Sequence, residues 1–161
     1  MATEVSDNAS TLHEDSHSSY SIVVRTSEVE HADTVAIVRV QLSDEEGRQT
    51  DRMTLRQTFS HRKSFRRGHS DLFLITNQPS LGRISTVEVT HDSKHLDADK
   101  RRWHLHSVMV LNHDNGKIYN FPHGKWIGIN SSAEVGEETS TMLKVVGEGF
   151  TVLPDHFKPL F

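Results

Sequence analysis

Arg66-Arg67-Gly68-His69-Ser70-Asp71-Leu72-Phe73-Leu74-Ile75 is followed by Ser80-Leu81-Gly82-Arg83-Ile84-Ser85-Thr86-Val87-Glu88-Val89-Thr90-His91-Asp92, and a charged loop then leads to Trp103. Each run begins after a turn that contains glycine and continues with β-branched or aromatic residues. This pattern is typical of strands that bury one face. We therefore interpret the stretch as the middle of an all-β sandwich.

The segments on either side continue the same pattern. Seven strands are predicted, over residues 20–26, 34–42, 52–58, 70–75, 83–90, 103–112 and 117–121. Strict alternation places Trp103, Leu105, Ser107, Met109 and Leu111 on one face of a single strand. No long helical periodicity interrupts these strands, so an antiparallel sandwich is the expected architecture. Residues 142–146 and 149–153 are candidates to pair with each other as two further strands.

Composition divides the 161 residues into one domain and two acidic ends. Residues 1–19 carry four acids and no lysine or arginine, and they have too little apolar surface to order, so a disordered acidic tail is expected. Residues 20–128 form the predicted domain. Residues 129–161 are a C-terminal extension whose structure the sequence does not predict. Cysteine is absent, which excludes a disulfide framework, a thiol nucleophile and a cysteine-based zinc site.

Membrane-spanning and targeting signals are not expected. No apolar run approaches the ~18 residues that a transmembrane helix needs. The start Met1-Ala2-Thr3-Glu4 has no basic or apolar region of a signal peptide, and Ala2 stands where myristoylation requires glycine. These features, with the absence of cysteine, suit the cytosol.

A longer pattern resembles a known family. The chain contains Phe65-x-x-Gly68-x-x-Asp71-x-Phe73, Leu81-Gly82, His91-Asp92, Trp103-x-Leu105-x-x-Val108-x-Val110 and Gly116-Lys117-x-Tyr119-x-Phe121-Pro122-x-x-Lys125-Trp126. In this order and spacing over residues 20–128, they resemble a PLAT (polycystin-1, lipoxygenase, alpha-toxin) domain. The runs Pro79-Ser80-Leu81-Gly82 and Phe65-Arg66-Arg67-Gly68 most resemble the polycystin-1-like branch.

The resemblance implies an eight-stranded antiparallel β-sandwich of two four-stranded sheets. It also implies a non-catalytic module that docks its host on membranes or on partner proteins, here as part of, or related to, a polycystin-like membrane protein. In polycystin-like proteins this module is cytosolic and next to a membrane span, so the resemblance implies a cytoplasmic location, either peripheral to a membrane or as the cytosolic part of a membrane protein. No nucleophile elbow, phosphate loop, paired acid–base motif or zinc signature is present, so an enzyme is not expected. A protein-interaction module with no direct lipid binding is the alternative function.

Two basic loops are the predicted lipid-binding sites, Arg62, Lys63, Arg66 and Arg67 in the first and Lys100, Arg101 and Arg102 in the second. Such clusters suit anionic headgroups, since each cation near an anionic membrane contributes ~1 kcal/mol. The alternative is solvated loops whose arginines pair with Asp71 or Glu88. Phe59 and Phe65 are predicted in the core, which disfavours nucleic acid. Trp103 is the one aromatic residue beside the second loop and is also predicted in the core, so charge attraction is expected in place of insertion into the bilayer.

Calcium is the one cofactor considered, and none is certain. In relatives that bind it, the resemblance implies acids in the loop before the second strand and in the loop after His-Asp, which here are Asp33 and Asp92. Lys94 lies inside the second loop and opposes a cation, so the preferred interpretation is a solvated Asp33 and a turn-capping Asp92. His104 and His106 share a strand face, but spacing identifies no third ligand for zinc.

Overall fold

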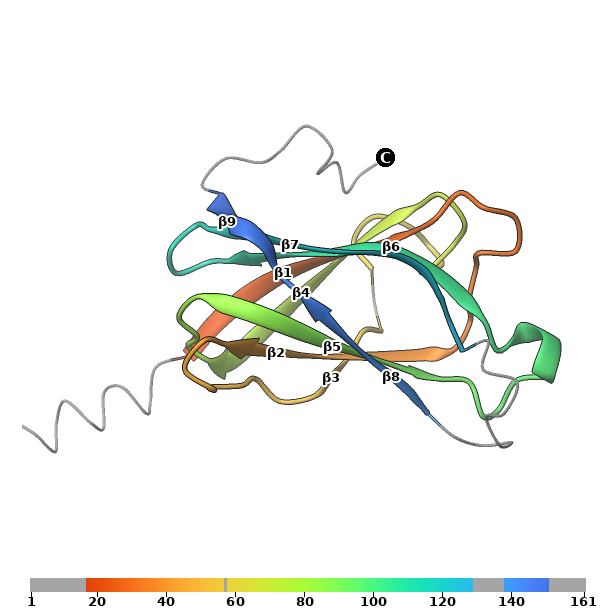
Figure 1. Ribbon diagram of the computed structural model, residues 1–161, viewed down its shortest axis with the longest axis horizontal. Helices are drawn as coiled ribbons and strands as arrows, with labels where there is room; N and C mark the ends of the chain where they lie inside the picture. The colour runs from red at the N-terminus through yellow and green to blue at the C-terminus, as the bar shows by residue number, and fades with distance from the viewer. Residues whose placement is uncertain (1–16, 57, 129–137, 151–161) are drawn as a thin grey trace, which may run out of the picture.

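The structure is a computed structural model that describes residues 17–56, 58–128 and 138–150. Predictions for residues 1–16, 129–137 and 151–161 lie outside these ranges. Two antiparallel sheets stack face to face (Figure 1). The elements are β1 (His17–Thr26), β2 (Ile37–Asp44), β3 (Met53–Thr54), β4 (Ser70–Pro79), β5 (Ile84–Asp92), a 3-10 turn η1 (Ala98–Lys100), β6 (Trp103–Asn112), β7 (Ile118–Ile127), β8 (Thr139–Lys144) and β9 (Val146–Phe150).

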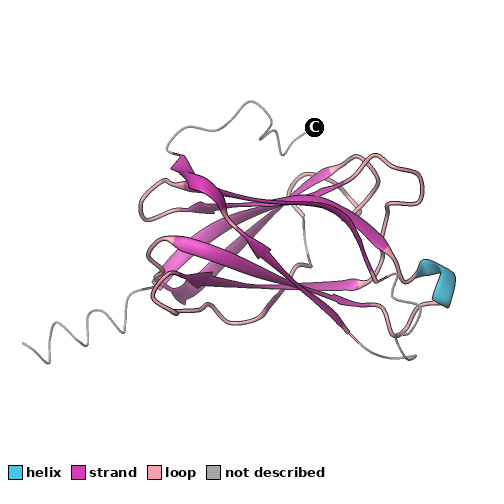
Figure 2. Ribbon diagram, viewed as in Figure 1, coloured by secondary structure: helices cyan, strands magenta, loops and turns pink. Residues whose placement is uncertain are grey.

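The all-β antiparallel sandwich predicted from sequence is confirmed, and the strand count differs. One sheet has the order β4-β1-β6-β7-β9, and the other has the order β3-β2-β5-β8. Figure 2 shows how strands dominate the described chain. The structure therefore has five and four strands in its two sheets, where two sheets of four were expected. The additional strand is β9.

The last two strands join the two sheets. β8 pairs with β5 in the four-stranded sheet, and β9 pairs with β7 in the five-stranded sheet. Residues 142–146 and 149–153 were predicted to pair with each other, and this prediction is wrong. Val145, between the two strands, donates its N–H to Ser85 O at 2.9 Å. The chain crosses from one sheet to the other at this point.

The described strands extend beyond both predicted ends of the domain, residues 20 and 128. β1 begins at His17, so residues 17–19 belong to a strand and not to a disordered tail. Ser18 is 3% exposed, and its hydroxyl hydrogen-bonds to Ser80 Oγ at 2.7 Å and to the carboxylate of Asp114. These partners hold the start of the strand in place. At the other end, β8 and β9 lie beyond residue 128 and complete the sandwich.

A bulge changes the side-chain phase of β6. The register shifts between Leu105 and Ser107, and residues after it exchange faces. Trp103 and Leu105 are in the main core, as predicted, but Val108 and Val110 join them there. Met109 instead packs with Val23 and Ile118 in a separate apolar cluster. The single uninterrupted alternation expected for this strand is therefore wrong.

The core is closed by aromatic residues at the β1–β6 end. Trp103 is fully buried and donates Nε1–H to Thr26 Oγ1 at 3.0 Å. Its ring stacks on His91 with centroids 5.8 Å apart, and Phe65 meets it edge-on at 5.2 Å. Buried aromatic residues of this size contribute more to stability than any other apolar group, and edge-on packing adds about 1 kcal/mol per pair.

The opposite end of the four-stranded sheet is closed by one buried acid. Asp44 ends β2, and its carboxylate accepts hydrogen bonds from the N–H groups of Glu46, Arg48 and Gly82 and from Arg48 Nε, at 2.8–3.0 Å. Burial opposes ionisation, but these hydrogen bonds and the Arg48 charge hold the pKa of Asp44 below its ordinary value. We call this region, residues 44–48, 79–83 and 112–117, the turn end.

Candidate functional site

Three loops meet at the end of the sandwich opposite the turn end. Register places Ile37 beside Asp92 at this end, whereas Asp44 lies beside Ile84 at the other. The loops are residues 27–36, residues 55–56 with 58–69, and residues 93–102. Backbone hydrogen bonds link them or the strands next to them, from Thr34 N to Phe65 O at 3.1 Å, from Gly68 N to Ser27 O at 2.9 Å and from His104 N to Ala32 O at 3.1 Å. We call these three loops the basic end.

The first basic loop is built around a buried phenylalanine. Phe65 has a left-handed φ of 59°, an unfavourable conformation for a bulky residue. Two features hold it there. The Asp71 carboxylate accepts the Phe65 N–H at 2.8 Å, and the ring is buried against Phe73 and Trp103. With its core anchored in this way, the loop directs its polar residues outward.

Within the described residues, neither Asp71 nor Glu88 pairs with an arginine of the basic loops, so the alternative predicted from sequence is wrong. Asp71 is fully buried and accepts a backbone N–H instead of a cation. Arg52 does pair with Glu88, at 2.9 Å. This pair lies upstream of the loop, on the β3 side of the four-stranded sheet, so it leaves the loop's own cations unaffected.

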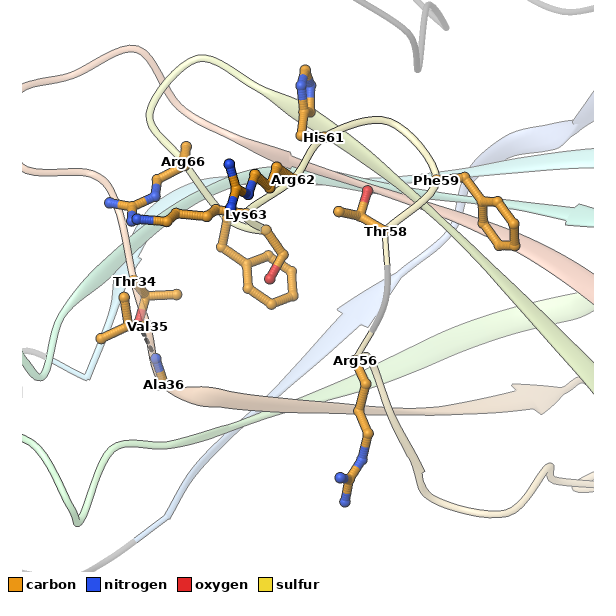
Figure 3. Close-up of a pocket in the computed structure, with 12 residues that line it drawn as sticks. Thr34, Val35, Ala36, Arg56, Thr58, Phe59, His61, Arg62, Lys63 and Arg66 are labelled. Atoms are coloured by element: carbon orange, nitrogen blue, oxygen red, sulfur yellow. Dashed lines mark hydrogen bonds between the residues drawn. The ribbon is translucent and has the colours of Figure 1, made fainter.

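Part of the loop borders a hollow of about 740 Å³. The lining combines cations with apolar side chains, namely Thr34, Val35, Ala36, Arg56, Thr58, Phe59, His61, Arg62, Lys63, Ser64, Phe65 and Arg66. In Figure 3, Arg62, Lys63 and Arg66 gather on the side of the loop nearer Val35, and Phe59 lies on the other side. Arg56 stands apart from them, on the strand side of the loop.

A second hollow, of about 470 Å³, shares Thr34 and Val35 with the first. Unlike the first hollow, it is lined by both acidic and basic side chains, namely His31, Asp33, Asp99, Lys100 and Arg102. Two basic segments that lie more than thirty residues apart in the sequence therefore flank the same Thr34-Val35 ridge. No local sequence signal indicates this juxtaposition.

The seven predicted lipid-binding residues divide into held and unpaired groups. Arg66 lies 3.6 Å from Asp33, Arg67 Nε donates to Glu28 O at 2.8 Å, Arg101 Nε donates to Leu96 O at 2.8 Å, and Arg102 lies 5.3 Å from the centre of the Trp126 ring. Among the described residues, no ion pair or side-chain hydrogen bond involves Arg62, Lys63 or Lys100. The same holds for Arg56, which was not a predicted site residue.

Exposed apolar side chains accompany these cations. Phe65 is 2% exposed, as predicted, but Phe59 is 66% exposed, so its predicted core position is wrong. Val35 is 58% exposed on the shared ridge. Phe59 is turned outward because its N–H bonds to Leu72 O at 2.7 Å, which fixes the backbone alongside the edge of β4. Isolated Phe residues in a polar loop give no sequence signal that separates the two orientations.

The two calcium candidates do not form a calcium site with their neighbours. The Asp92 side chain is 4% exposed, and its Oδ2 lies 3.5 Å from Arg39 Nη1 and 3.8 Å from Lys94 Nζ. Asp33 pairs with Arg66. Across the described ranges, no three acids, histidines or cysteines come close enough together to hold a metal. Calcium requires roughly six to eight oxygen ligands, so the residues present do not fit this ion.

His104 and His106, the pair considered for zinc, have other partners, and so does the buried His91. His104 Nδ1 hydrogen-bonds to Ser27 Oγ at 2.6 Å, and His106 Nδ1 to Ser107 Oγ at 2.9 Å. His91 is fully buried, and its Nε2 hydrogen-bonds to Thr34 Oγ1 at 2.9 Å. Burial lowers the pKa of His91 to about 4, although the nearby Asp92 charge acts in the opposite direction. His91 therefore supports the base of the Thr34-Val35 ridge as a neutral side chain.

The fold of the chain is similar to domains of solved structures. Coral 8R-lipoxygenase, whose structure is described in terms of calcium activation via a C2-like domain, superposes with a TM-score of 0.62 at 21% identity, over 79% of this chain and 17% of that one. Alpha toxin from Clostridium absonum superposes with a TM-score of 0.57 at 13% identity, over 83% and 32%. No helix in the described part of the chain is long and apolar enough to cross a membrane.

Sequence comparison identifies the family. Lipoxygenase homology domain-containing protein 1 of Mus musculus is 29% identical over 113 residues, which cover 70% of this chain and 5% of that protein. The allene oxide synthase-lipoxygenase protein of Plexaura homomalla is 24% identical over 108 residues, which cover 67% and 10%. The chain thus spans a small fraction of the length of these relatives. A model of the PLAT/LH2 domain matches residues 20–141, and the chain therefore belongs to the PLAT/LH2 domain family.

Proposed function

We propose that this PLAT domain is a non-catalytic module that docks on membranes with anionic headgroups through its basic end. One observation carries the proposal. Arg56, Arg62 and Lys63, which have no ion pair or side-chain hydrogen bond with any described residue, line the same hollow as the exposed side chains of Phe59 and Val35. Cations beside exposed apolar groups suit a surface that offers phosphate oxygens above an apolar interior.

The magnitudes support weak and reversible binding. These three cations and Lys100 on the second hollow, which also has no side-chain partner in the described ranges, give an attraction of a few kcal/mol at ~1 kcal/mol each. Partial burial of Phe59 adds about 1–2 kcal/mol, because full burial of such a side chain is worth about 1.5–3 kcal/mol. The apolar contribution differs from the purely electrostatic docking expected from sequence, and it adds an attraction that salt does not screen.

The relatives support a docking role and leave the host open. The description of the coral lipoxygenase assigns calcium activation to a C2-like domain of that enzyme. A polycystin-like host and a cytoplasmic location remain predictions from the resemblance, since the relatives named above are lipoxygenase and lipoxygenase-homology proteins. Non-catalytic docking suits each of these hosts.

Vesicle sedimentation tests the proposal. The chain is mixed with phosphatidylcholine vesicles with and without phosphatidylserine or a phosphoinositide, at low and high salt. We expect binding to the anionic vesicles that weakens with salt, and at least a roughly 30-fold loss for Arg62→Glu/Lys63→Glu, from ~1 kcal/mol per cation. Arg83→Glu/Lys117→Glu is the charge-matched control at the turn end, and it should bind nearly as the parent does.

A protein partner is the second candidate. Met142 and Val146 are 54% and 55% exposed on the segment that joins the two sheets. Met142 lies on β8 and Val146 begins β9, and exposed apolar side chains of this size suit a protein contact. If the chain stays in the supernatant with every vesicle composition, lipid docking is excluded and this surface becomes the one to mutate.

A further inference from the structure

The acids at the basic end already carry cations from the same chain. Asp92 Oδ2 lies 3.5 Å from Arg39 Nη1 and 3.8 Å from Lys94 Nζ. Asp33 Oδ2 lies 3.6 Å from Arg66 Nη1. Three tethered positive charges therefore surround the two carboxylates for which a divalent cation was considered.

Arg39 also joins separate strands through its charge. It lies on β2, and the nitrogen that faces Asp92 at the end of β5 is also 3.3 Å from Glu138 Oε1, next to the start of β8. The Arg39 side chain is only 27% exposed, so the medium around it screens these attractions less than bulk water does. One guanidinium thus links the three longest strands of the four-stranded sheet.

Arg66 has the corresponding position on the docking loop. Its pair with Asp33 joins the loop that carries Arg62 and Lys63 to the loop that carries the Thr34-Val35 ridge. The same two loops are also linked by the bond from Thr34 N to Phe65 O. The cation therefore helps to hold the two hollows next to each other without an ion from solution.

A calcium ion would bind here only by displacing these side chains. It needs roughly six to eight oxygens, and the two carboxylates supply at most four. The displaced Arg39, Lys94 and Arg66 would stay nearby as uncompensated positive charges, and they would repel the incoming ion.

We propose that Arg39, Lys94 and Arg66 replace calcium as tethered counter-cations, so that the basic end is assembled permanently and its docking is independent of calcium. The part about docking rests on the proposed function. The part about the cations concerns folding and ion binding alone, and it can be tested without vesicles.

Calorimetric titration of the full chain with calcium tests ion binding directly. We expect no saturable heat up to about 1 mM, the weak end of the range for protein sites. We also expect the Tm in calcium to match the Tm in chelator within about 1 °C, since a ligand that binds the native state would raise it. Saturable binding that Asp92→Asn abolishes would overturn the proposal.

Substitution of the tethered cation tests its structural role. Arg39→Gln leaves Asp92 without its closest cation, and we expect the Tm to fall by about 5 °C. Arg83→Gln is the matched control, because Arg83 pairs with the half-exposed Glu45 at 3.4 Å, and its Tm should change by less than about 2 °C. Equal Tm values for Arg39→Gln and the parent would contradict the proposal.

Vesicle binding in calcium and in chelator separates the two proposals. Equal binding in both supports tethered cations and lipid docking together. Binding that occurs only with calcium supports docking and overturns calcium independence. Absence of binding in both, with no heat of calcium binding, overturns lipid docking and supports the absence of a calcium site.

Discussion

Asp44 and Asp92 occupy equivalent positions at opposite ends of the four-stranded sheet, and the chain surrounds them differently. Asp44 ends β2 with a side chain that is 0% exposed, and Asp92 ends β5 with one that is 4% exposed. Four donors at 2.8–3.0 Å saturate Asp44. Asp92 has two cations at 3.5 and 3.8 Å and one long N–H contact, from Lys94, at 3.4 Å.

The difference separates a structural end from an adaptable one. Three of the donors to Asp44 are backbone N–H groups, so the turn end cannot change shape without losing hydrogen bonds. Asp92 is neutralised mainly by long side chains, which can move while the strands stay in register. The domain thus combines a rigid turn end with a basic end whose charges can adjust to a partner.

The largest effect is expected from Asp44→Ala. Removing the carboxylate takes away the acceptor of Arg48 Nε and of three backbone N–H groups, which should lower the free energy of unfolding by about 3–5 kcal/mol. Urea denaturation followed by tryptophan fluorescence measures this loss. Glu45→Ala, which removes an exposed partner of Arg83, is the neighbouring control and should change stability by less than about 1 kcal/mol. Similar losses in the two variants would remove the distinction between the ends.

The second prediction concerns pH and His91. The pKa of His91 is lowered to about 4 in the folded protein, so between about pH 6.5 and 4 the unfolded chain binds a proton that the folded chain does not. Stability should therefore fall as pH falls through this window, by about 3 kcal/mol in total. His91→Phe should lose this part of the pH dependence. An NMR titration in which the His91 ring protonates near pH 6.5 would contradict the prediction.

The third prediction tests the exposed ring at the basic end. Phe59→Ala should leave the free energy of unfolding within about 0.5 kcal/mol, because the side chain is 66% exposed. Its vesicle affinity should fall roughly 10-fold, through the loss of about 1–2 kcal/mol of apolar contact. Phe65→Ala provides the contrast, since a buried ring should cost about 3–5 kcal/mol of stability. Unchanged vesicle affinity of Phe59→Ala would leave charge as the whole attraction.

The smallest effect is expected for Asp33→Asn. The Asp33–Arg66 pair is about one-third exposed on each side, and such pairs contribute at most about 1 kcal/mol. We expect a loss of about 0.5 kcal/mol in thermal or urea unfolding. A loss comparable to that of Asp44→Ala would show that the basic end is as rigid as the turn end.

Alternation predicted most of the fold because sandwich strands are buried on one face. Over residues 35–42, which include most of β2, Ala36, Val38, Val40 and Leu42 are buried as the pattern predicts, while Val35 and Ile37 are exposed. The pattern failed where the period changed. The bulge after Leu105 exchanges Met109 and Val108 between faces, and no residue type there marks it. β4 and β7 also extend further than expected, through Pro79 and Pro122.

The sequence predicted which residues of the candidate site are basic, but it did not predict which of them lie together on one surface. The basic runs could be read directly, but their convergence at Val35 depends on contacts between loops far apart in the chain. The same applies to the division between held and unpaired cations, since Arg66 is neutralised by Asp33 and Arg67 is held by a backbone oxygen. Lys94 was a sequence signal against calcium, whereas Arg39, the nearer cation, was missed because it lies mid-strand.

The two short final strands have a consequence for solubility. β8 covers the outer edge of β5, and β9 covers that of β7. A chain cut at Gly128 would leave both edges with unpaired N–H and C=O groups, which invite pairing with another copy. The family model matches only as far as residue 141, so a boundary chosen from family resemblance would remove β9 and part of β8. Residues 138–150 thus protect the domain from edge-to-edge aggregation.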